Sequence, residues 1–196
     1  MMIFSITAVM AENAAVTVTD MFGRDITIQG EITRVIAMEP GDCEILCALG
    51  GEDLLVGRGA YCDYPASVMA LPSLQSGSMM NIEEVLALEP QLVIMNGMDH
   101  PVEQVEQLES NGVYVISTYA ANIEETYECI RLIGAAIGKT AEAEALVSEM
   151  QTTFAVNMLA LVNNQSQPKI LSLRNILDEY IEHQKDIITR RTRYDL

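Results

Sequence analysis

Residues 34–65 read RVIAMEPGDCEILCALGGEDLLVGRGAYCDYP, and this stretch decides the fold. It opens with the apolar run 34–38, which predicts a buried strand. Residues 41–49 follow with helical spacing and stop at Gly50-Gly51, where a left-handed helix C-cap is easy. A second apolar run at 54–57 predicts another strand, and a loop rich in Gly, Tyr and Pro follows at 58–65. The order strand, helix, strand predicts a parallel sheet whose strands are linked by helices.

The flanking sequence continues this alternation. Upstream, two alternating segments around a glycine turn predict a β-hairpin at 16–19 and 25–28. Downstream, we expect strands at 91–95 and 113–116, separated and followed by helices. We therefore predict an α/β domain over residues 16–139 with a parallel sheet of about four strands. A long helix over 140–163 should follow, because its apolar residues repeat at helical spacing.

Parallel sheets bind ligands beyond the C-terminal ends of their strands. That rule selects the loops 39–42, 58–65, 75–80 and 96–100 as candidate binding loops. The chain has no Gly-Lys-Ser phosphate loop, and Gly57-Arg58-Gly59 lacks the third glycine of a dinucleotide fingerprint. Nucleotide chemistry therefore has no support in the sequence.

The charge of the chain changes near its end. Residues 1–163 carry 5 Lys and Arg against 23 Asp and Glu, whereas residues 164–196 carry 6 against 5. The acidic body argues against nucleic-acid binding, because phosphate contacts need a basic surface. No apolar run is long enough to span a membrane. We interpret residues 164–196 as a separate amphipathic helical segment with a basic tip.

Residues 1–15 are similar to the back half of a secretory signal. An apolar run ends in the small-residue pattern Val9-Met10-Ala11, but no Lys or Arg precedes Arg24. We expect a truncated signal and an extracytoplasmic location; a buried N-terminal strand or a disordered tail is the alternative. The four cysteines, Cys43, Cys47, Cys62 and Cys129, have the spacing of neither a zinc site nor a disulfide framework. We expect them to be buried free thiols.

Three stretches together resemble one protein family. They are Thr19-Asp20 to Gly23-Arg24, the stretch 34–65, and NIEEVLALEPQLVIM at 81–95. Their order is similar to the N-terminal lobe of the periplasmic substrate-binding proteins that serve ABC importers of ferric siderophores, haem and cobalamin. The resemblance covers about residues 16–163. It implies a Rossmann-like parallel-sheet lobe of a periplasmic-binding-protein fold, with the helix 140–163 joining two lobes and the ligand held between them. It also implies a binding protein without a cofactor, not an enzyme, with an ABC permease in the membrane as its partner.

The resemblance suggests roles for individual residues. Family position implies that Glu83, with Glu84 beside it, docks onto arginines of the permease; alternatively, either carboxylate only complements a helix dipole. Tyr61 stands where these proteins place an aromatic side chain toward the ligand, or it packs on its own domain. We expect ligand contacts from the binding loops, at Glu39, Pro40, Arg58, Tyr61, Gln75, Met79, Met80 and Met98.

The identity of the ligand stays open between a ferric siderophore, haem and cobalamin. Arg58 is the only cation on the four candidate loops, which weakens the case for an anionic siderophore. Met79, Met80, Met98 and His100 are residue types that ligate haem iron. Methionines in a Met-rich chain usually fill gaps, however, and a lone loop histidine is usually solvated.

Residues 171–196, LSLRNILDEYIEHQKDIITRRTRYDL, are similar to a helical segment of the A protein of bacterial DNA gyrase or topoisomerase IV. This implies a chimera, in which an N-terminal lobe without its second lobe binds ligand weakly and carries a foreign helix. The apolar stripe of that helix predicts self-association through 174–195 as one way to cover it. The alternative is a topoisomerase-related fragment for DNA interaction or helical assembly. An α/β enzyme lacks support, because His100 and His183 are the only histidines and no catalytic arrangement accompanies them.

Overall fold

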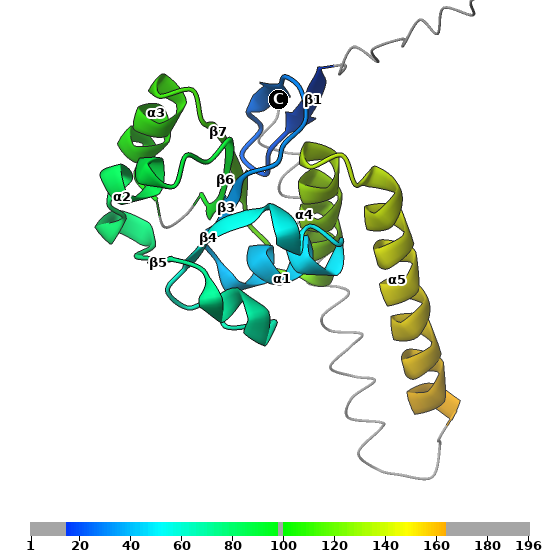
Figure 1. Ribbon diagram of the computed structural model, residues 1–196. Coiled ribbons are helices and arrows are strands. Elements are labelled where there is room, and N and C mark those ends of the chain that lie inside the picture. Colours follow the sequence, from blue (N-terminus) through cyan, green and yellow to red (C-terminus); the bar gives the residue numbers. More distant parts are fainter. Residues whose placement is uncertain (1–14, 98–99, 164–196) are drawn as a thin grey trace, which may run out of the picture. The chain divides into compact units, whose positions relative to one another are not determined.

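The computed structural model describes residues 15–97 and 100–163, and a parallel sheet forms its centre (Figure 1). The sheet has five strands in the order β5-β4-β3-β6-β7. Their bounds are β3 (Val35–Ala37), β4 (Leu55–Gly59), β5 (Ser73–Leu74), β6 (Leu92–Asn96) and β7 (Tyr114–Thr118). All four pairings are parallel, which confirms the predicted α/β class. The short strand β5 was not predicted.

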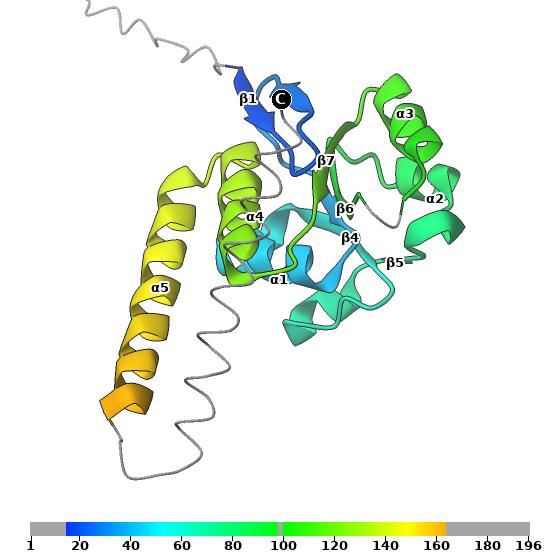
Figure 2. The same cartoon turned by 180° about the vertical axis from the view of Figure 1, so that it is seen from behind.

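Helices cover both faces of the sheet (Figures 1 and 2). On one face α1 (Pro40–Ala48) packs against α4 (Ile123–Ala136), and on the other α2 (Ile82–Ala87) packs against α3 (Val102–Ser110). Three 3-10 turns connect these elements: η1 (Glu52–Leu54), η2 (Ala66–Ala70) and η3 (Gly77–Met79). This layering explains why the strands read as continuous apolar runs, since side chains on both faces are buried.

The core lies on both sides of the central strands. Val93 and Met95 of β6 belong to a cluster that Val85 of α2 and Leu108 of α3 complete. Because side chains alternate along a strand, Ile94 faces the opposite layer, and it too is fully buried. Burying each such side chain contributes roughly 1.5–3 kcal/mol, so the sheet and its two helical layers stabilise one another.

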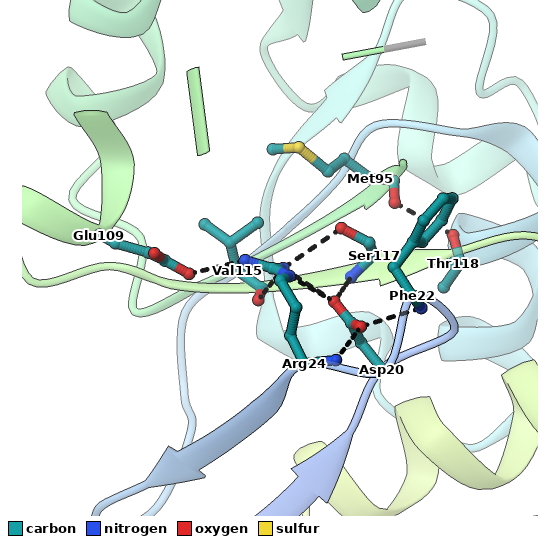
Figure 3. Close-up of polar contacts among 8 residues, drawn as sticks. All are labelled: Asp20, Phe22, Arg24, Met95, Glu109, Val115, Ser117 and Thr118. Carbon is teal, nitrogen blue, oxygen red and sulfur yellow. Dashed lines mark hydrogen bonds and ion pairs between the residues drawn. The ribbon is translucent and has the colours of Figure 1, made fainter. Parts of the chain in front are cut away.

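A hairpin of β1 (Val16–Thr19) and β2 (Asp25–Ile28) packs beside α4 and β7, as the alternating pattern predicted. Its turn is held by the buried carboxylate of Asp20, which accepts hydrogen bonds from the backbone N–H groups of Phe22, Arg24 and Ser117. The Arg24 guanidinium donates to the same carboxylate and also to the Val115 carbonyl oxygen (Figure 3). These bonds fasten the hairpin to the end of β7.

Helix α5 runs from Thr140 to Asn163, and the compact unit that contains the sheet ends at Val147. The first turns of α5 belong to that unit, where Arg131 pairs with Glu144 at 2.8 Å. No helix within the described residues is long and apolar enough to cross a membrane. The segment 1–14 and the tail 164–196, with its predicted self-association, lie outside the described residues.

Candidate functional site

A pocket of about 290 Å³ lies at the C-terminal ends of β3, β6 and β7. The start of α1, the end of β6, the residues after β7 and one face of α4 line it. Its walls include Glu39, Pro40, Asp42, Ile45, Asn96, Thr118, Tyr119 and Cys129. The pocket is therefore at the edge of the sheet where the strand-end rule places ligands.

The local sequence explains how the chain turns at this edge. After β3, Glu39 is extended and Pro40 occupies the first helical position, where its fixed backbone angle suits a helix start. The end of β4 comes so close to this turn that a Cβ at Gly59 would lie 1.8 Å from the carbonyl oxygen of Met38. Only glycine fits at that position. Phe22 of the hairpin lies against Gly97, just beyond β6, and remains exposed to solvent.

Asp42 is a buried acid in the wall of the pocket. Its Oδ2 lies 2.9 Å from the hydroxyl oxygen of Thr118, which is also 3.2 Å from the carbonyl oxygen of Met95. The Thr118 hydroxyl donates to the Asp42 carboxylate, and the carbonyl oxygen of Met95 is a second acceptor within its reach. Burial raises the pKa of Asp42 to about 7, and the charge of Glu39 adds to the rise while the Thr118 bond opposes it.

His100 is buried, although a solvated loop histidine was expected. Its Nε2 accepts a hydrogen bond of 3.3 Å from the backbone N–H of Gly77, so its Nδ1 carries the hydrogen and donates to Gln104 at 3.1 Å. Glu39 Oε1 lies 3.9 Å from Nε2. His100 thus joins the η3 loop to α3. The expectation of solvation was wrong because these tertiary contacts cover the ring.

Two of the residues predicted to contact the ligand, Arg58 and Met80, are buried. Arg58 lies inside β4, and its buried guanidinium donates to the carbonyl oxygens of Gly59 and Cys62. Met80 is buried in the cluster formed with α2 and α3. Neither side chain is exposed at the strand-end surface. Arg58 binds the loop that follows β4, and Met80 packs in the core.

The other predicted contact residues are at the surface or lie outside the described part. Tyr61 and Met79 are 76% and 74% exposed, which leaves both free to meet a ligand. Gln75 is exposed, and Glu39 and Pro40 line the pocket. Met98 lies outside the described residues. The structure thus places Glu39 and Pro40 in one pocket, whereas Tyr61, Gln75 and Met79 belong to neighbouring loops.

Glu83 and Glu84 are exposed in the first turn of α2, as predicted. The side chain of Asn81 caps this helix by accepting from the backbone N–H groups of both residues. Its amide also donates to the Glu84 carboxylate at 3.4 Å. The Glu83 carboxylate has no such partner within the described residues, so it remains available for an external cation.

Sequence reasoning missed the part of the pocket that follows β7. Thr118, Tyr119 and Cys129 were not predicted as pocket residues, whereas Asp42 and Asn96 lie in two of the predicted binding loops. The strand-end rule was applied to four loops, and applying it to the strand predicted at 113–116 would have selected Thr118 and Tyr119. Cys129 offered no such signal, because its place depends on how α4 packs.

Comparisons with known proteins agree with this geometry. Residues 35–179 match the family described as periplasmic binding protein. An uncharacterized ABC transporter substrate-binding lipoprotein of Bacillus subtilis, YvrC, is 32% identical over 141 residues, which are 70% of this chain and 44% of that protein. A vitamin B12-binding protein of Salmonella choleraesuis is 31% identical over 102 residues, 52% of this chain and 38% of that protein.

Among solved structures, a periplasmic heme-binding protein from Pseudomonas aeruginosa superposes with a TM-score of 0.61 at 28% identity. The superposition covers 69% of this chain and 50% of that one. The chain therefore spans half or less of the length of these relatives. The similarity confirms the fold expected from the resemblance.

A different relative matches a shorter segment. The A protein of DNA gyrase from Streptococcus pneumoniae is 61% identical over 49 residues, 25% of this chain and 6% of that protein. This confirms the predicted second resemblance, and the match is longer than the stretch 171–196 on which the prediction rested. The periplasmic binding protein match ends at residue 179 and so reaches into that stretch.

Proposed function

Because the chain belongs to the periplasmic binding protein family, we propose that it is a substrate-binding component of an ABC importer, located outside the cytoplasm. Its substrate is a metal complex of the haem, cobalamin or ferric siderophore type. It binds this substrate at the strand-end edge of the sheet without catalysing a reaction. One matching relative is named as a substrate-binding lipoprotein of an ABC transporter and another as a vitamin B12-binding protein, which supports this proposal.

The charges of the side chains at the strand-end edge of the sheet favour one class of ligand over another. Arg58, the cation predicted there, is buried and bound to carbonyl oxygens. The other described cations are Arg24, Arg34, Arg131 and Lys139, and each bonds to a carboxylate or carbonyl group elsewhere on the lobe. The edge instead offers Tyr61, Met79 and an acidic pocket. Such a surface suits the flat, apolar ring of haem or a corrinoid better than an anionic siderophore.

The described residues form one lobe, so they cover one side of a bound ligand. Ligand pockets that bind tightly bury most of the ligand surface. We therefore propose weak binding by this chain. We also propose that the exposed carboxylate of Glu83 docks onto arginines of a membrane permease, because it forms this contact without losing a bond to any described residue.

A titration of the purified chain with haem, cyanocobalamin and a ferric catecholate siderophore tests the proposal. We expect dissociation constants above about 1 μM, with haem or cobalamin binding at least tenfold more tightly than the siderophore. Tyr61→Ala and Met79→Ala should each weaken binding several-fold. Met69→Ala is the matched control, since Met69 is an exposed methionine on η2.

Three outcomes would contradict parts of the proposal. Preferred binding of the siderophore would overturn the argument from charge. Salt-dependent binding of duplex DNA without binding of any metal complex would favour the topoisomerase-related alternative, which the gyrase similarity supports. Submicromolar affinity for a metal complex would contradict weak binding but not the binding function itself.

A further inference from the structure

The second half of α5 exposes apolar side chains that continue the buried face of its first half. Ala143 and Val147 are each 1% exposed, because the first turns of α5 pack closely on α4, where a Cβ at Gly134 would lie 2.5 Å from the Cβ of Ala143. No side chain that the structure describes in 148–159 is buried. Phe154 is 47% exposed, although its spacing places it on the same face as Ala143 and Val147. Burial of this face therefore ends at Val147 within the described residues.

This half of α5 also lacks the charges that surface helices carry. Residues 150–163 read MQTTFAVNMLALVN, and none of them is Asp, Glu, Lys or Arg. Val156 and Leu159 are exposed as well, at 58% and 60%. Surface helices normally turn charged or polar residues to the water. An uncharged helix end with exposed apolar side chains, in a chain of net charge −17, therefore indicates a docking surface.

The tail of the same chain offers a complementary surface. Its large apolar and aromatic residues recur at helical spacing, at Leu173, Ile176, Leu177, Tyr180, Ile181, Ile187 and Ile188. The link 164–169, NQSQPK, separates this pattern from α5, and its Pro168 cannot continue a helix. Two apolar helical patterns joined by a short polar link are typical of a helical hairpin.

We propose that residues 174–190 form a helix that folds back antiparallel along α5 and covers the face of Met150, Phe154 and Met158. The lengths of the two segments match. As helices, residues 148–163 measure about 24 Å and residues 174–190 about 25 Å. The ten residues between them extend to at most about 36 Å, which is ample for the chain to reverse its direction.

Charge favours the tail over a second copy as the partner of α5. The antiparallel direction brings Arg190, Arg191 and Arg193 to the start of the uncharged segment, where Glu149 is exposed. A second copy would instead bring another acidic lobe, since residues 1–163 carry 23 Asp and Glu against 5 Lys and Arg. The like charges of two lobes repel each other. The short link also keeps the tail at a high effective concentration beside α5.

The gyrase similarity supports a common origin of the two helices. It extends over 49 residues of this chain, and a match of that length that includes all of 171–196 begins at residue 148. The compact unit that contains the sheet ends one residue earlier, at Val147. Such a match places the second half of α5 and the tail in one parent sequence. Segments from one parent are expected to fit each other, whereas neither evolved against this lobe.

Hydrogen exchange followed by mass spectrometry tests this contact on the full chain, without any ligand. We expect the backbone amides of 150–163 to exchange about tenfold more slowly in the full chain than in a chain that lacks 174–196, because a packed helix opens less often. The amides of β6 are the internal standard. They should exchange alike in both chains, which shows that the lobe is folded in each. Sedimentation at low and high protein concentration should show a monomer.

Phe154→Asp should speed exchange in both 150–163 and 174–190, because it places a charge between the two helices. Val156→Asp is the matched control and should leave both segments unchanged, since Val156 lies on the opposite side of α5 and is 58% exposed. Equal exchange in the full and shortened chains would overturn the proposal. Protection of 150–163 that appears only at high protein concentration would also overturn it and would assign this face to a second copy. Equal effects of the two substitutions would show that the tail does not cover the face of Phe154.

Discussion

Thr118 at the end of β7 and Asp42 in the first turn of α1 are joined through their side chains, with Thr118 Oγ1 2.9 Å from Asp42 Oδ2. The two residues are 76 positions apart, and both are buried. Their contact ties the last strand of the sheet to the helix that lines the pocket. The protonation of Asp42 therefore affects both the stability of the lobe and the charge of the pocket wall.

We predict that Asp42→Asn changes the pH dependence of stability. The pKa of Asp42 is raised from 3.8 to about 7 in the folded chain by burial, so the folded state holds this proton more tightly than the unfolded state. The contribution of this proton to the free energy of unfolding has its full value below about pH 4. It falls as the pH rises toward 7 and does not change further above that pH. Asparagine cannot ionise, so the free energy of unfolding of the variant should rise relative to that of the unaltered chain across this pH range. The rise should be at most on the order of 4 kcal/mol.

Urea unfolding of both chains between pH 4 and 8 measures this difference. Asp53→Asn, at an exposed position on η1, is the control and should follow the unaltered chain. If the Asp42→Asn and unaltered curves stay parallel at every pH, the pKa of Asp42 is not raised in the folded chain and this prediction is wrong.

Asp20→Ala should destabilise the lobe by about 3–5 kcal/mol, because it removes a buried carboxylate that pairs with the partly exposed Arg24 and leaves several N–H donors without an acceptor. Chemical denaturation gives the free energy of unfolding. Asp25→Ala is the matched control, since Asp25 lies on the same hairpin and its carboxylate accepts an exposed hydrogen bond from Thr19. We expect the control to lose less than about 1 kcal/mol. Equal losses would show that the Asp20 network does not anchor the hairpin.

Gly59→Ala should prevent stable folding, because the new methyl group would lie 1.8 Å from the carbonyl oxygen of Met38 and two neighbouring strands would have to separate. Gly41→Ala is the matched change. Its Cβ meets nothing within 4 Å, and alanine is the better helix former by about 1 kcal/mol. Thermal unfolding followed by circular dichroism should show loss of the transition in the first variant and an unchanged or higher midpoint in the second. A native-like midpoint for Gly59→Ala would refute the close approach.

Much of the fold could be predicted from local sequence, because each long strand is a continuous apolar run between turn residues. The strands expected at 34–38 and 91–95 correspond to β3 and β6. Strand β5 has only the two residues Ser73 and Leu74, and it exists because both pair with the end of β4. Two residues carry no periodic pattern, so no local rule could have found it.

The site was less predictable, because tertiary contacts decide which loop residues are free. Arg58 and Tyr61 are three positions apart in one predicted loop, yet Arg58 is 6% exposed and Tyr61 is 76% exposed. Nothing in their spacing separates these outcomes. The pairing of Asp42 with Thr118 likewise depends on the order of β3, β6 and β7 in the sheet.

Glu83→Gln should weaken association with the membrane permease several-fold at low salt, because it removes an exposed carboxylate that forms no internal bond in the described chain. Glu84→Gln should have a smaller effect, since the amide of Asn81 already engages the Glu84 carboxylate. Binding to permease in nanodiscs at two salt concentrations measures both. Equal effects of the two changes, or a loss that salt does not reduce, would contradict the assignment of Glu83.

Deletion of residues 174–196 should leave the unfolding midpoint of the lobe within about 2 °C of the full chain. Every buried apolar residue in the described part lies between Val18 and Val147. The expectation rests on the resemblance of the tail to DNA gyrase, because the apolar stripe of a foreign helix did not evolve to fit this core. A helix that packed on this core would bury four or five large side chains, and its loss would lower the midpoint by several degrees. Scanning calorimetry at two protein concentrations measures the change. A large drop that does not depend on concentration would show that the tail is integral to the lobe, whereas a drop that grows with concentration would support self-association through 174–195.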